Sequence, residues 1–245
     1  MRVNQLVGAV FVLSVRSFSD RIEHMRAEMA RHDIEFEFVF EFDANAIPPA
    51  VVEETFGPSD LGRAQQSLVL KHLHVQRQCV ERGLERVLVF EDDAVLDPDF
   101  ANGFAAAMRE ADRLAPGYLV YLGRGNNSYL GTKESSFELV AGGLLPATEA
   151  LVFDRASAER RLDYVATHPV VRPADWLLRE VDAAVETPHY WLRRPLVEQG
   201  SMNGRFDSVL DAKRHRRGRR FAGLLYRWRG FWKGPARDLL RWRSR

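Results

Sequence analysis

Apolar positions in the first part of the chain switch between continuous runs and helical spacing. Residues 7–15 form a continuous apolar run rich in β-branched side chains, which predicts a strand covered on both faces. Residues 20–31 begin with an acid and end with Arg31, the charge order that the helix dipole favours. Residues 36–42 place four Phe side chains at alternate positions, which predicts a second strand. The three segments together predict a strand–helix–strand unit.

The alternation of helices and strands continues along the chain. Residues 46–62 are rich in Pro and Gly and are predicted to be mostly loop. A long helix is predicted for residues 63–82, with Gly83 as its C-terminal stop. Further strands are predicted at residues 86–96, 118–122 and 150–153, a polar loop at 123–131, and a helix at 156–164. This order indicates an α/β fold with a mainly parallel central sheet.

Composition excludes several classes of protein. The chain has 245 residues, 46% hydrophobic and 28% charged, which are globular values and exclude disordered and fibrous proteins. Its single cysteine, Cys79, can form neither an internal disulfide nor a cysteine-based zinc site, which indicates a reducing, cytoplasmic compartment. No segment approaches the ~18 apolar residues that span a bilayer. The apolar run at 6–15 lacks a following Ala-x-Ala-like cleavage site, so a buried strand is favoured over a signal peptide.

Charge divides the chain into two parts. Residues 212–245 contain thirteen Lys or Arg and one acid, Asp238, so they carry +12. Because the formal net charge is +1, residues 1–211 carry −11. Such an asymmetry concerns partners and location more than fold. We therefore expect a globular domain over 1–211 and a basic, Trp-rich tail over 212–245.

Apolar side chains recur at helical spacing between the cations of the tail, at Phe221, Leu224, Leu225, Trp228 and Trp232. This pattern is typical of an amphipathic helix that lies in a membrane interface, where each Lys or Arg near anionic lipid contributes about 1 kcal/mol. We expect peripheral association with the anionic inner face of the membrane. Nucleic-acid binding is less favoured because no nucleic-acid-binding fold is recognised. A disordered tail fits poorly with three Trp.

Three consecutive acids, Glu91, Asp92 and Asp93, follow directly on the apolar strand that begins at residue 86. In open α/β sheets, ligands bind beyond the carboxyl ends of the strands. Carboxylate oxygens suit Mg²⁺ and Mn²⁺, which bridge readily to phosphates. Alternate residues face the same way, so Glu91 and Asp93 can act together while Asp92 points elsewhere. A solvated turn is the alternative interpretation.

Four segments, in order, carry a recognisable pattern. Residues 72–93 contain a His, a helix, a Gly-Leu turn, an apolar strand and then Glu-Asp-Asp. The others are residues 12–21, similar to V-I-N-L…D-R, residues 148–158, similar to G-A-Y-L-I-S-R…A, and residues 173–175 with 195–199, similar to P-x-D and P-L-V-x-Q. Over residues 7–208 this order resembles glycosyltransferase family 25, the lipopolysaccharide-biosynthesis family that also includes collagen galactosyltransferases.

The chain also departs from that family pattern. Lys71 stands where the family has the Ser of a Ser-His pair, and Ser14 stands where its opening strand has Asn. Residues 65–68, Gln-Gln-Ser-Leu, replace Glu-x-Gly-Cys. These departures surround the expected donor site, so they bear on the donor sugar more than on the class of reaction.

The resemblance implies a GT-A type, nucleotide-sugar-binding domain that uses a UDP-sugar and a divalent metal, Mn²⁺ or Mg²⁺. Asp93 would ligate the metal that bridges the two phosphates, and Glu91 would assist the metal or the ribose. The residues expected to contact the donor are Ser14, Arg16, Arg21, His72, Glu91 and Asp92.

The resemblance further implies inversion at the anomeric carbon, so a base should take the proton of the acceptor hydroxyl. Asp175 is the first candidate because an acid beside an aromatic residue suits a sugar-binding cleft, and a helix N-cap is its alternative role. Glu198 is the second candidate, as base or acceptor contact. His189 could be a further metal ligand, but a packing or surface role is favoured.

The sequence therefore predicts an inverting, metal-assisted glycosyltransferase. It would move galactose or glucose from UDP to a hydroxyl of a lipopolysaccharide-type or other cell-surface glycan. The alternative is a catalytically silent, membrane-docked accessory protein that binds a nucleotide-sugar or a glycan. A magnesium phosphatase or nucleotidyltransferase is disfavoured, because one such phosphatase class needs Asp at position 91, where Glu stands.

The tail generates a first prediction. Deletion of residues 212–245 should release the protein from vesicles of anionic lipid, because the apolar stripe and all thirteen cations of the tail are lost. Hydrolysis of the donor should remain, because the expected site lies in residues 1–211. Co-sedimentation with the vesicles checks this, and unchanged vesicle binding by the truncated protein would contradict it.

Overall fold

The computed structural model describes residues 2–123, 139–142, 148–192, 194–203 and 206. The predicted loop after Gly123 and the tail at 212–245 lie outside the described residues, so the tail stays a prediction. Within the described part of the chain, no helix is both long and apolar enough to cross a membrane.

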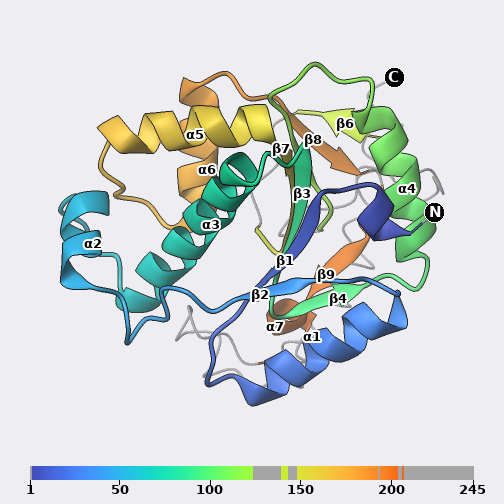
Figure 1. Cartoon of the computed structure of the whole chain (residues 1–245), viewed down its shortest axis with the longest axis horizontal. Helices are drawn as coiled ribbons and strands as arrows, with labels where there is room; N and C mark the ends of the chain where they lie inside the picture. The colour runs from blue at the N-terminus through green and yellow to red at the C-terminus, as the bar shows by residue number, and fades with distance from the viewer. Residues whose placement is uncertain (1, 124–138, 143–147, 193, 204–205, 207–245) are drawn as a thin grey trace, which may run out of the picture.

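Helices and strands alternate along the chain, as the sequence predicted (Figure 1). After a 3-10 turn, η1 (Val3–Gln5), the helices are α1 (Ser19–Arg31), α2 (Pro49–Thr55), α3 (Arg63–Glu81), α4 (Phe100–Ala111), α5 (Arg155–Thr167), α6 (Ala174–Ala184) and α7 (Gly200–Asn203). The strands are β1 (Ala9–Leu13), β2 (Glu37–Val39), β3 (Arg86–Glu91), β4 (Ala94–Leu96), β5 (Leu119–Tyr121), β6 (Leu139–Ala141), β7 (Ala150–Asp154), β8 (His189–Leu192) and β9 (Val197–Gln199).

The central sheet has the strand order β2-β1-β3-β7-β5-β8-β6. β1 pairs in parallel with β2 and β3, and β5 pairs in parallel with β8. β7 is antiparallel to β3 and β5, and β6 is antiparallel to β8. The α/β class is confirmed, and the sheet is mixed: β1, β2, β3, β5 and β8 share one direction, while β7 and β6 run against it.

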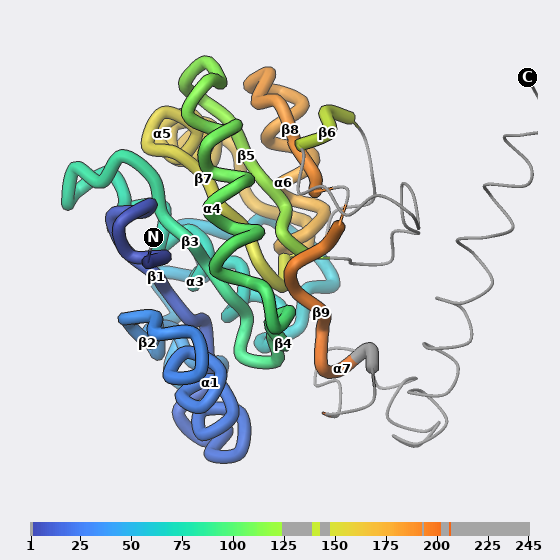
Figure 2. The backbone as a smooth tube through the Cα atoms, turned by 90° about the vertical axis from the view of Figure 1, so that its right-hand side faces the viewer, coloured from blue at the N-terminus to red at the C-terminus, as the bar shows by residue number. Residues whose placement is uncertain are grey.

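Helices cover both faces of this sheet, as Figures 1 and 2 show. Alternate residues of β3 separate the two cores: Val87 and Val89 pack with residues of α3, α5 and α6, whereas Leu88 and Phe90 pack with residues of α1 and α4. β1 is buried along its whole length, as its continuous apolar run predicted.

Helix α3 ends as predicted at Gly83, which has a left-handed φ of 64°. Its amide donates to Val80 O (3.0 Å), and the Leu84 amide donates to Cys79 O (2.9 Å), so the last turn closes as a Schellman motif. Cys79 is fully buried on this helix, in agreement with its predicted role as a small apolar residue. Burial raises the pKa of its thiol to about 11.

Residues 46–62 are mostly loop, as predicted, but they also contain the short helix α2. Pro49 is the first residue of that helix, where its fixed φ is compatible with a helix and its missing N–H is not needed. A pair of prolines therefore started a helix at a place where composition alone predicted a loop.

The predicted strand at 36–42 is shorter than expected, since β2 ends at Val39. The rings of Phe36, Phe38 and Phe40 still form a row, with centroids 4.9 and 5.0 Å apart. Phe42 has a left-handed φ of 60°, which ends the alternation and places its ring 6.0 Å from His74. The predicted strand at 86–96 is likewise interrupted, because β4 leaves the central sheet and pairs with β9 in a separate ribbon.

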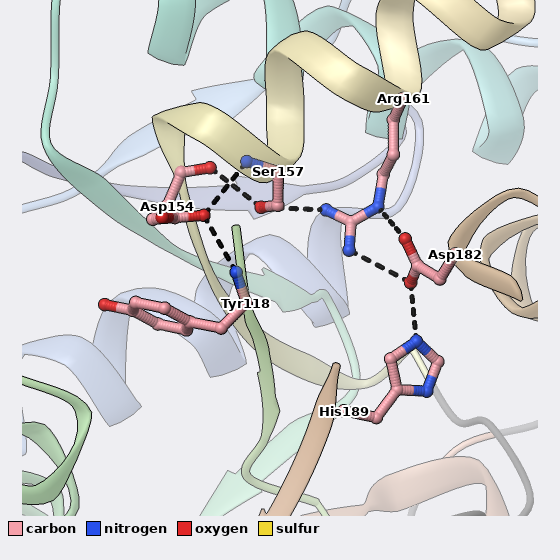
Figure 3. Close-up of polar contacts among 6 residues, drawn as sticks. All are labelled: Tyr118, Asp154, Ser157, Arg161, Asp182 and His189. Carbon is pink, nitrogen blue, oxygen red and sulfur yellow. Dashed lines mark hydrogen bonds and ion pairs between the residues drawn. The ribbon is translucent and has the colours of Figure 1, made fainter. Parts of the chain in front are cut away.

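A buried ion pair joins α5, α6 and β8 (Figure 3). The Arg161 guanidinium donates to both oxygens of Asp182 (2.6 and 3.0 Å), and His189 Nε2 lies 2.7 Å from the same carboxylate. The Asp182 side chain is fully buried. Burial opposes ionisation, yet Arg161 and His189 outweigh it and lower the pKa of Asp182. His189 thus has the packing role that the sequence favoured.

Asp154 connects this pair to the end of β7 (Figure 3). Its carboxylate accepts from the Gly117 amide (2.6 Å), the Tyr118 amide (3.1 Å) and the Ser157 amide (3.0 Å), so it caps α5. The Ser157 hydroxyl in turn lies 3.3 Å from Arg161 Nη1. These contacts join helices α5 and α6 to strands β7 and β8 of the central sheet.

Asp182→Asn should destabilise the fold by about 3 kcal/mol at neutral pH, because it leaves the Arg161 charge buried without its partner. A lowered carboxylate pKa stabilises the folded state above the unfolded pKa and ceases to do so as the pH falls through the folded value. The difference in unfolding free energy between wild type and variant should therefore shrink below about pH 4. Urea titrations over this pH range check it, and a constant difference would contradict the ion pair.

Candidate functional site

The carboxyl ends of β1, β2 and β3 lie at one edge of the sheet. Leu13 is in register with Val39 on one side and with Glu91 on the other. The loops that follow the three strands therefore meet at this edge, and the acidic residues are part of it. This is the place where the sequence predicted a ligand site.

Asp92 is the buried centre of a polar contact between three elements. Its Oδ2 accepts from the Ser14 hydroxyl (2.8 Å), and its Oδ1 accepts from Arg21 Nη1 (2.6 Å). Burial raises the pKa of Asp92, and Arg21 and Ser14 oppose that rise. The Asp92 side chain thus points toward Ser14 and Arg21, in a different direction from Glu91, as predicted. It joins α1 and the end of β1 to the end of β3. The sequence predicted that Ser14 and Arg21 contact the donor, but the Ser14 hydroxyl and the Arg21 guanidinium both bind Asp92. Donor contact by Ser14, Arg21 and Asp92 therefore stays a prediction.

Glu91 faces residues from α3 and from the segment before β7. The Thr148 hydroxyl donates a short hydrogen bond to Glu91 Oε1, and His72 Nε2 lies 3.9 Å from the same oxygen. The Glu91 amide donates to Glu149 O (3.0 Å). Within the described ranges, buried His72 Nε2 has no hydrogen-bond partner. The structure therefore brings two predicted site residues, His72 and Glu91, together.

Asp93 is almost completely buried, and only one of its two carboxylate oxygens accepts a hydrogen bond from a described residue. Oδ2 accepts from the Ser201 amide (3.0 Å), and the backbone carbonyl of Asp93 accepts from Gly200 (2.7 Å). Oδ1 is buried with no hydrogen-bond partner among the residues that the structure describes. Burial and the neighbouring Glu91 raise the pKa of Asp93 to about 6. This oxygen is poorly compensated by the part of the site that the structure describes.

The segment after β9 closes over Asp93. A Cβ added at Gly200 would lie 2.7 Å from the Phe206 ring and 2.8 Å from Asp93 O, so the close approach requires glycine. The Phe206 ring lies 5.0 Å from the His24 ring and 5.5 Å from the Arg21 guanidinium. The segment after β9 thus contacts both Asp93 and helix α1, more than a hundred positions earlier in the chain.

The two predicted bases lie on different elements. Asp175 is in the first turn of α6, whose N-cap is Pro173, so it is not the cap that the sequence offered as its alternative role. Burial raises the pKa of Asp175, the Trp176 amide that bonds to it opposes the rise, and Glu91 adds to it. Asp175 is therefore close enough to Glu91 for their charges to interact. Glu198 lies on β9 opposite Val95, beside the strand that continues from Asp93.

Arg16 is exposed beyond the end of β1. Its guanidinium lies 4.7 Å from the centre of the Phe40 ring, and its backbone amide donates to Asp43 Oδ2 (3.0 Å). Lys71, the residue that departs from the family pattern, donates to the other oxygen of Asp43 (2.8 Å). Of the two arginines predicted to contact the donor, Arg21 binds Asp92, whereas the Arg16 guanidinium lies over Phe40.

No group of three or more His, Cys, Asp or Glu side chains in the described part of the chain is arranged to hold a metal ion. Glu91 and Asp93 nevertheless fit an ion of the Mg²⁺ class, which binds through one or two carboxylates and takes further oxygens from substrate phosphates and water. Asp93 Oδ1, which has no partner among the described residues and lies beside a second carboxylate, is the observation that supports this fit.

Sequence reasoning missed three residues that shape the site: Thr148, Ser201 and Asp43. Thr148 is the first residue of one of the four segments that resemble the family. That position was a signal from which its contact with the acids could have been predicted. Ser201 acts through its backbone amide, which leaves no mark in the sequence. Asp43 lies in a loop, and its partners are 27 and 28 positions away.

A family model, described as "Glycosyltransferase family 25 (LPS biosynthesis protein)", matches residues 8–140, more than half of the chain. The chain belongs to glycosyltransferase family 25. The matched region includes β1, α3, β3 and the three acids, so the resemblance seen in the sequence is confirmed.

The family 25 relatives differ in what their names say of activity. The chain is 29% identical over 186 residues to "Probable inactive glycosyltransferase 25 family member 3" of Bos taurus, covering 69% of this chain and 31% of that protein. It is 29% identical over 128 residues to "Inactive glycosyltransferase 25 family member 3" of Homo sapiens, covering 47% and 21%. It is 23% identical over 127 residues to "Procollagen galactosyltransferase 2" of Mus musculus, covering 47% and 20%. The chain thus spans a third or less of these relatives.

Among solved structures, one match is a crystal structure of mannose-1-phosphate geranyltransferase from Thermus thermophilus. It is 12% identical, covers 74% of this chain and 58% of the other, and superposes with a TM-score of 0.35. At that TM-score the likeness carries no argument about fold or function.

Neutralising adjacent acids should have opposite effects on stability. Asp92→Asn should destabilise the protein by about 3 kcal/mol, because Arg21 loses the partner of a largely buried ion pair. Asp93→Asn should cost nothing or stabilise by about 1 kcal/mol, because it removes repulsion from Glu91 at an oxygen that no described donor satisfies. Urea unfolding in EDTA compares the two. Equal destabilisation by both variants would contradict this division of roles.

Proposed function

We propose that this family 25 protein is an inverting, metal-assisted glycosyltransferase with a GT-A type domain over residues 1–211. The donor is a UDP-sugar, bound beyond the carboxyl ends of β1, β2 and β3. The buried Asp93 Oδ1, beside Glu91 and without a partner among the described residues, carries this proposal, because a divalent cation would compensate such an oxygen. Family membership supplies the class of reaction.

Asp93 and Glu91 are the residues that would hold the divalent metal, Mn²⁺ or Mg²⁺. When bound, the metal neutralises the charge that develops on the leaving diphosphate. The Ser201 amide and the Thr148 hydroxyl each bind one oxygen of these carboxylates, which orients the remaining oxygen toward the site. Asp92 keeps the turn between the two ligands in place through Arg21 and Ser14.

The remaining donor contacts come from two sides of the sheet edge. Arg16 offers an exposed guanidinium beyond β1, suited to a nucleotide. His72 offers a ring nitrogen from α3, next to Glu91, that has no hydrogen-bond partner in the described ranges. Ser14 and Arg21 both bind Asp92, and these contacts hold the ends of β1 and β3 in place next to the donor.

Asp175 is proposed as the base that takes the proton of the acceptor hydroxyl. Its pKa is raised by burial and by Glu91, and a carboxylate of raised pKa is a better proton acceptor near neutral pH. The exposed Trp176 follows it directly, as expected of a surface that meets a sugar. Glu198, at the edge of the β4–β9 ribbon, is the second candidate, as base or acceptor contact.

The transferred sugar is proposed to be galactose or glucose, and the acceptor a lipopolysaccharide-type or other cell-surface glycan. The family description names lipopolysaccharide biosynthesis, and one relative is named a galactosyltransferase. We place the protein in the cytoplasm, peripherally on the inner face of the membrane through the basic residues 212–245, because lipid-linked glycans are assembled there. Nucleic acid is not among its proposed partners.

A second candidate function rests on the relatives. Two of the three proteins compared above are named inactive or probably inactive. A catalytically silent, membrane-docked protein that binds a nucleotide-sugar or a glycan is therefore the alternative. In that case the site would bind the UDP-sugar or the glycan without release of UDP.

The test is a panel of UDP-sugars with Mn²⁺ or EDTA, read as thermal stabilisation and as release of UDP. The glycosyltransferase proposal expects metal-dependent release with one preferred donor, abolished by Asp93→Ala. Asp175→Asn should retain stabilisation by donor and metal and lose about 100-fold in transfer rate, as expected of a lost general base.

Each result distinguishes the candidates. Stabilisation by a UDP-sugar, with no release in the presence of lipid-linked or soluble glycan acceptors, would favour the accessory protein. Release that EDTA leaves unchanged would contradict the assignment of Glu91 and Asp93 to a metal. No response to any UDP-sugar would contradict both candidates as nucleotide-sugar-binding proteins.

A further inference from the structure

Lys71 is a buried ammonium that faces backbone and carboxylate oxygens. Its side chain is 3% exposed. Nζ donates to Glu41 O (2.7 Å), to Asp43 Oδ1 (2.8 Å) and, at 3.4 Å, to Val39 O. Three donors and three acceptors satisfy the ammonium, and they join α3 to the loop that follows β2.

Asp43 extends this contact to the first strand. While Oδ1 accepts from Lys71, Oδ2 accepts from the backbone amide of Arg16 (3.0 Å). From the loop after β2, the Asp43 carboxylate thus binds both the loop after β1, at Arg16, and helix α3, at Lys71. Without the ammonium, its partly buried carboxylate would keep only the amide contact among the partners that the structure gives it.

Arg16 lies at the far end of this connection. With its backbone held by Asp43, its guanidinium lies over the Phe40 ring at the edge where the carboxyl ends of β1, β2 and β3 meet. The same turn of α3 carries His72, which faces Glu91. One helix therefore contacts both sides of the proposed donor site through adjacent residues.

We propose that Lys71 is a positioning residue for the donor nucleotide: through Asp43 it fixes the loop that presents Arg16 at the donor site. This inference rests on the proposed function. Lys71 stands where the family pattern has a small hydroxyl residue, so this chain sets the loop with an internal cation. The ligand is the nucleotide part of a UDP-sugar, and Lys71 acts on it only through Asp43 and Arg16.

The first measurement reports on the loop and needs no ligand. In Lys71→Met, hydrogen exchange at the Arg16 amide should accelerate by about tenfold or more, because Asp43 loses the partner that holds it. Exchange in β1 should not change. Asp43→Asn should act in the same direction, and the double variant should be no worse than the more affected single variant, because the residues act through one another. If Lys71→Met fails to fold, Asp43→Asn carries the test.

The second measurement is the affinity for UDP in the presence of Mn²⁺. Lys71→Met should raise the Kd by about tenfold or more, and in donor hydrolysis KM should rise while kcat stays within about twofold. A merely structural loss would lower the active fraction and thus kcat, leaving KM unchanged.

Arg82→Met is the matched control. Arg82, the C-cap residue of α3, also contacts β2, through Glu37 at 2.8 Å, but at the amino end of the strand. This variant removes a cation between the same two elements, and it should leave exchange at the Arg16 amide and the affinity for UDP as in wild type. Equal effects from Lys71→Met and Arg82→Met would overturn the inference.

The outcomes separate this inference from the proposed function. Unchanged exchange at the Arg16 amide in both Lys71→Met and Asp43→Asn overturns the positioning role, whatever the protein binds. Accelerated exchange with unchanged affinity for UDP overturns its connection to the donor. Failure of the wild-type protein to bind UDP overturns the proposed function, and the exchange measurement still decides whether Lys71 fixes the loop.

Discussion

Three carboxylates share one end of a buried strand, and burial of such charges is costly unless each has a partner. Among the described residues, Asp92 has Arg21 and Ser14, Glu91 has Thr148 with His72 nearby, and Asp93 has only an amide at one oxygen. Satisfying these groups brings together α1, β1, α3 and the segments before β7 and after β9. The geometry of the sheet edge depends on this distribution of charge.

The uneven compensation separates structural from chemical roles within consecutive residues. A fully paired carboxylate stabilises the turn, whereas an incompletely paired one costs stability and is retained where a ligand completes it. Asp92 and Asp93 show this contrast, because their side chains leave β3 in different directions. Helix α3 shows the same contrast between a paired and an incompletely paired group. The Lys71 ammonium has its hydrogen-bond partners within the protein, whereas His72 Nε2 lies near Glu91 without a hydrogen bond among the described residues.

Membership of family 25 does not by itself establish that this chain is catalytically active. Relatives with a catalytic name and relatives named inactive resemble this chain at comparable identities, 23% and 29%, so family membership does not decide turnover. We propose that activity depends on individual groups: the carboxylates at 91 and 93, the acid at 175, and the internal cation at 71. Their placement supports the glycosyltransferase proposal more directly than the similarity does.

The sequence by itself determined the elements whose signals are local. Period and capping predicted β1, α1, α3 with its end at Gly83, and β3 leading into the acids, because burial pattern and turn chemistry act over a few residues. Only the tertiary structure decided the reversed direction of β7 and the β4–β9 ribbon. It also decided which acid would be paired, since Asp92 meets Ser14 across 78 positions and Asp93 meets Ser201 across 108. Contacts between such distant residues depend on how the elements pack, and no local pattern records them.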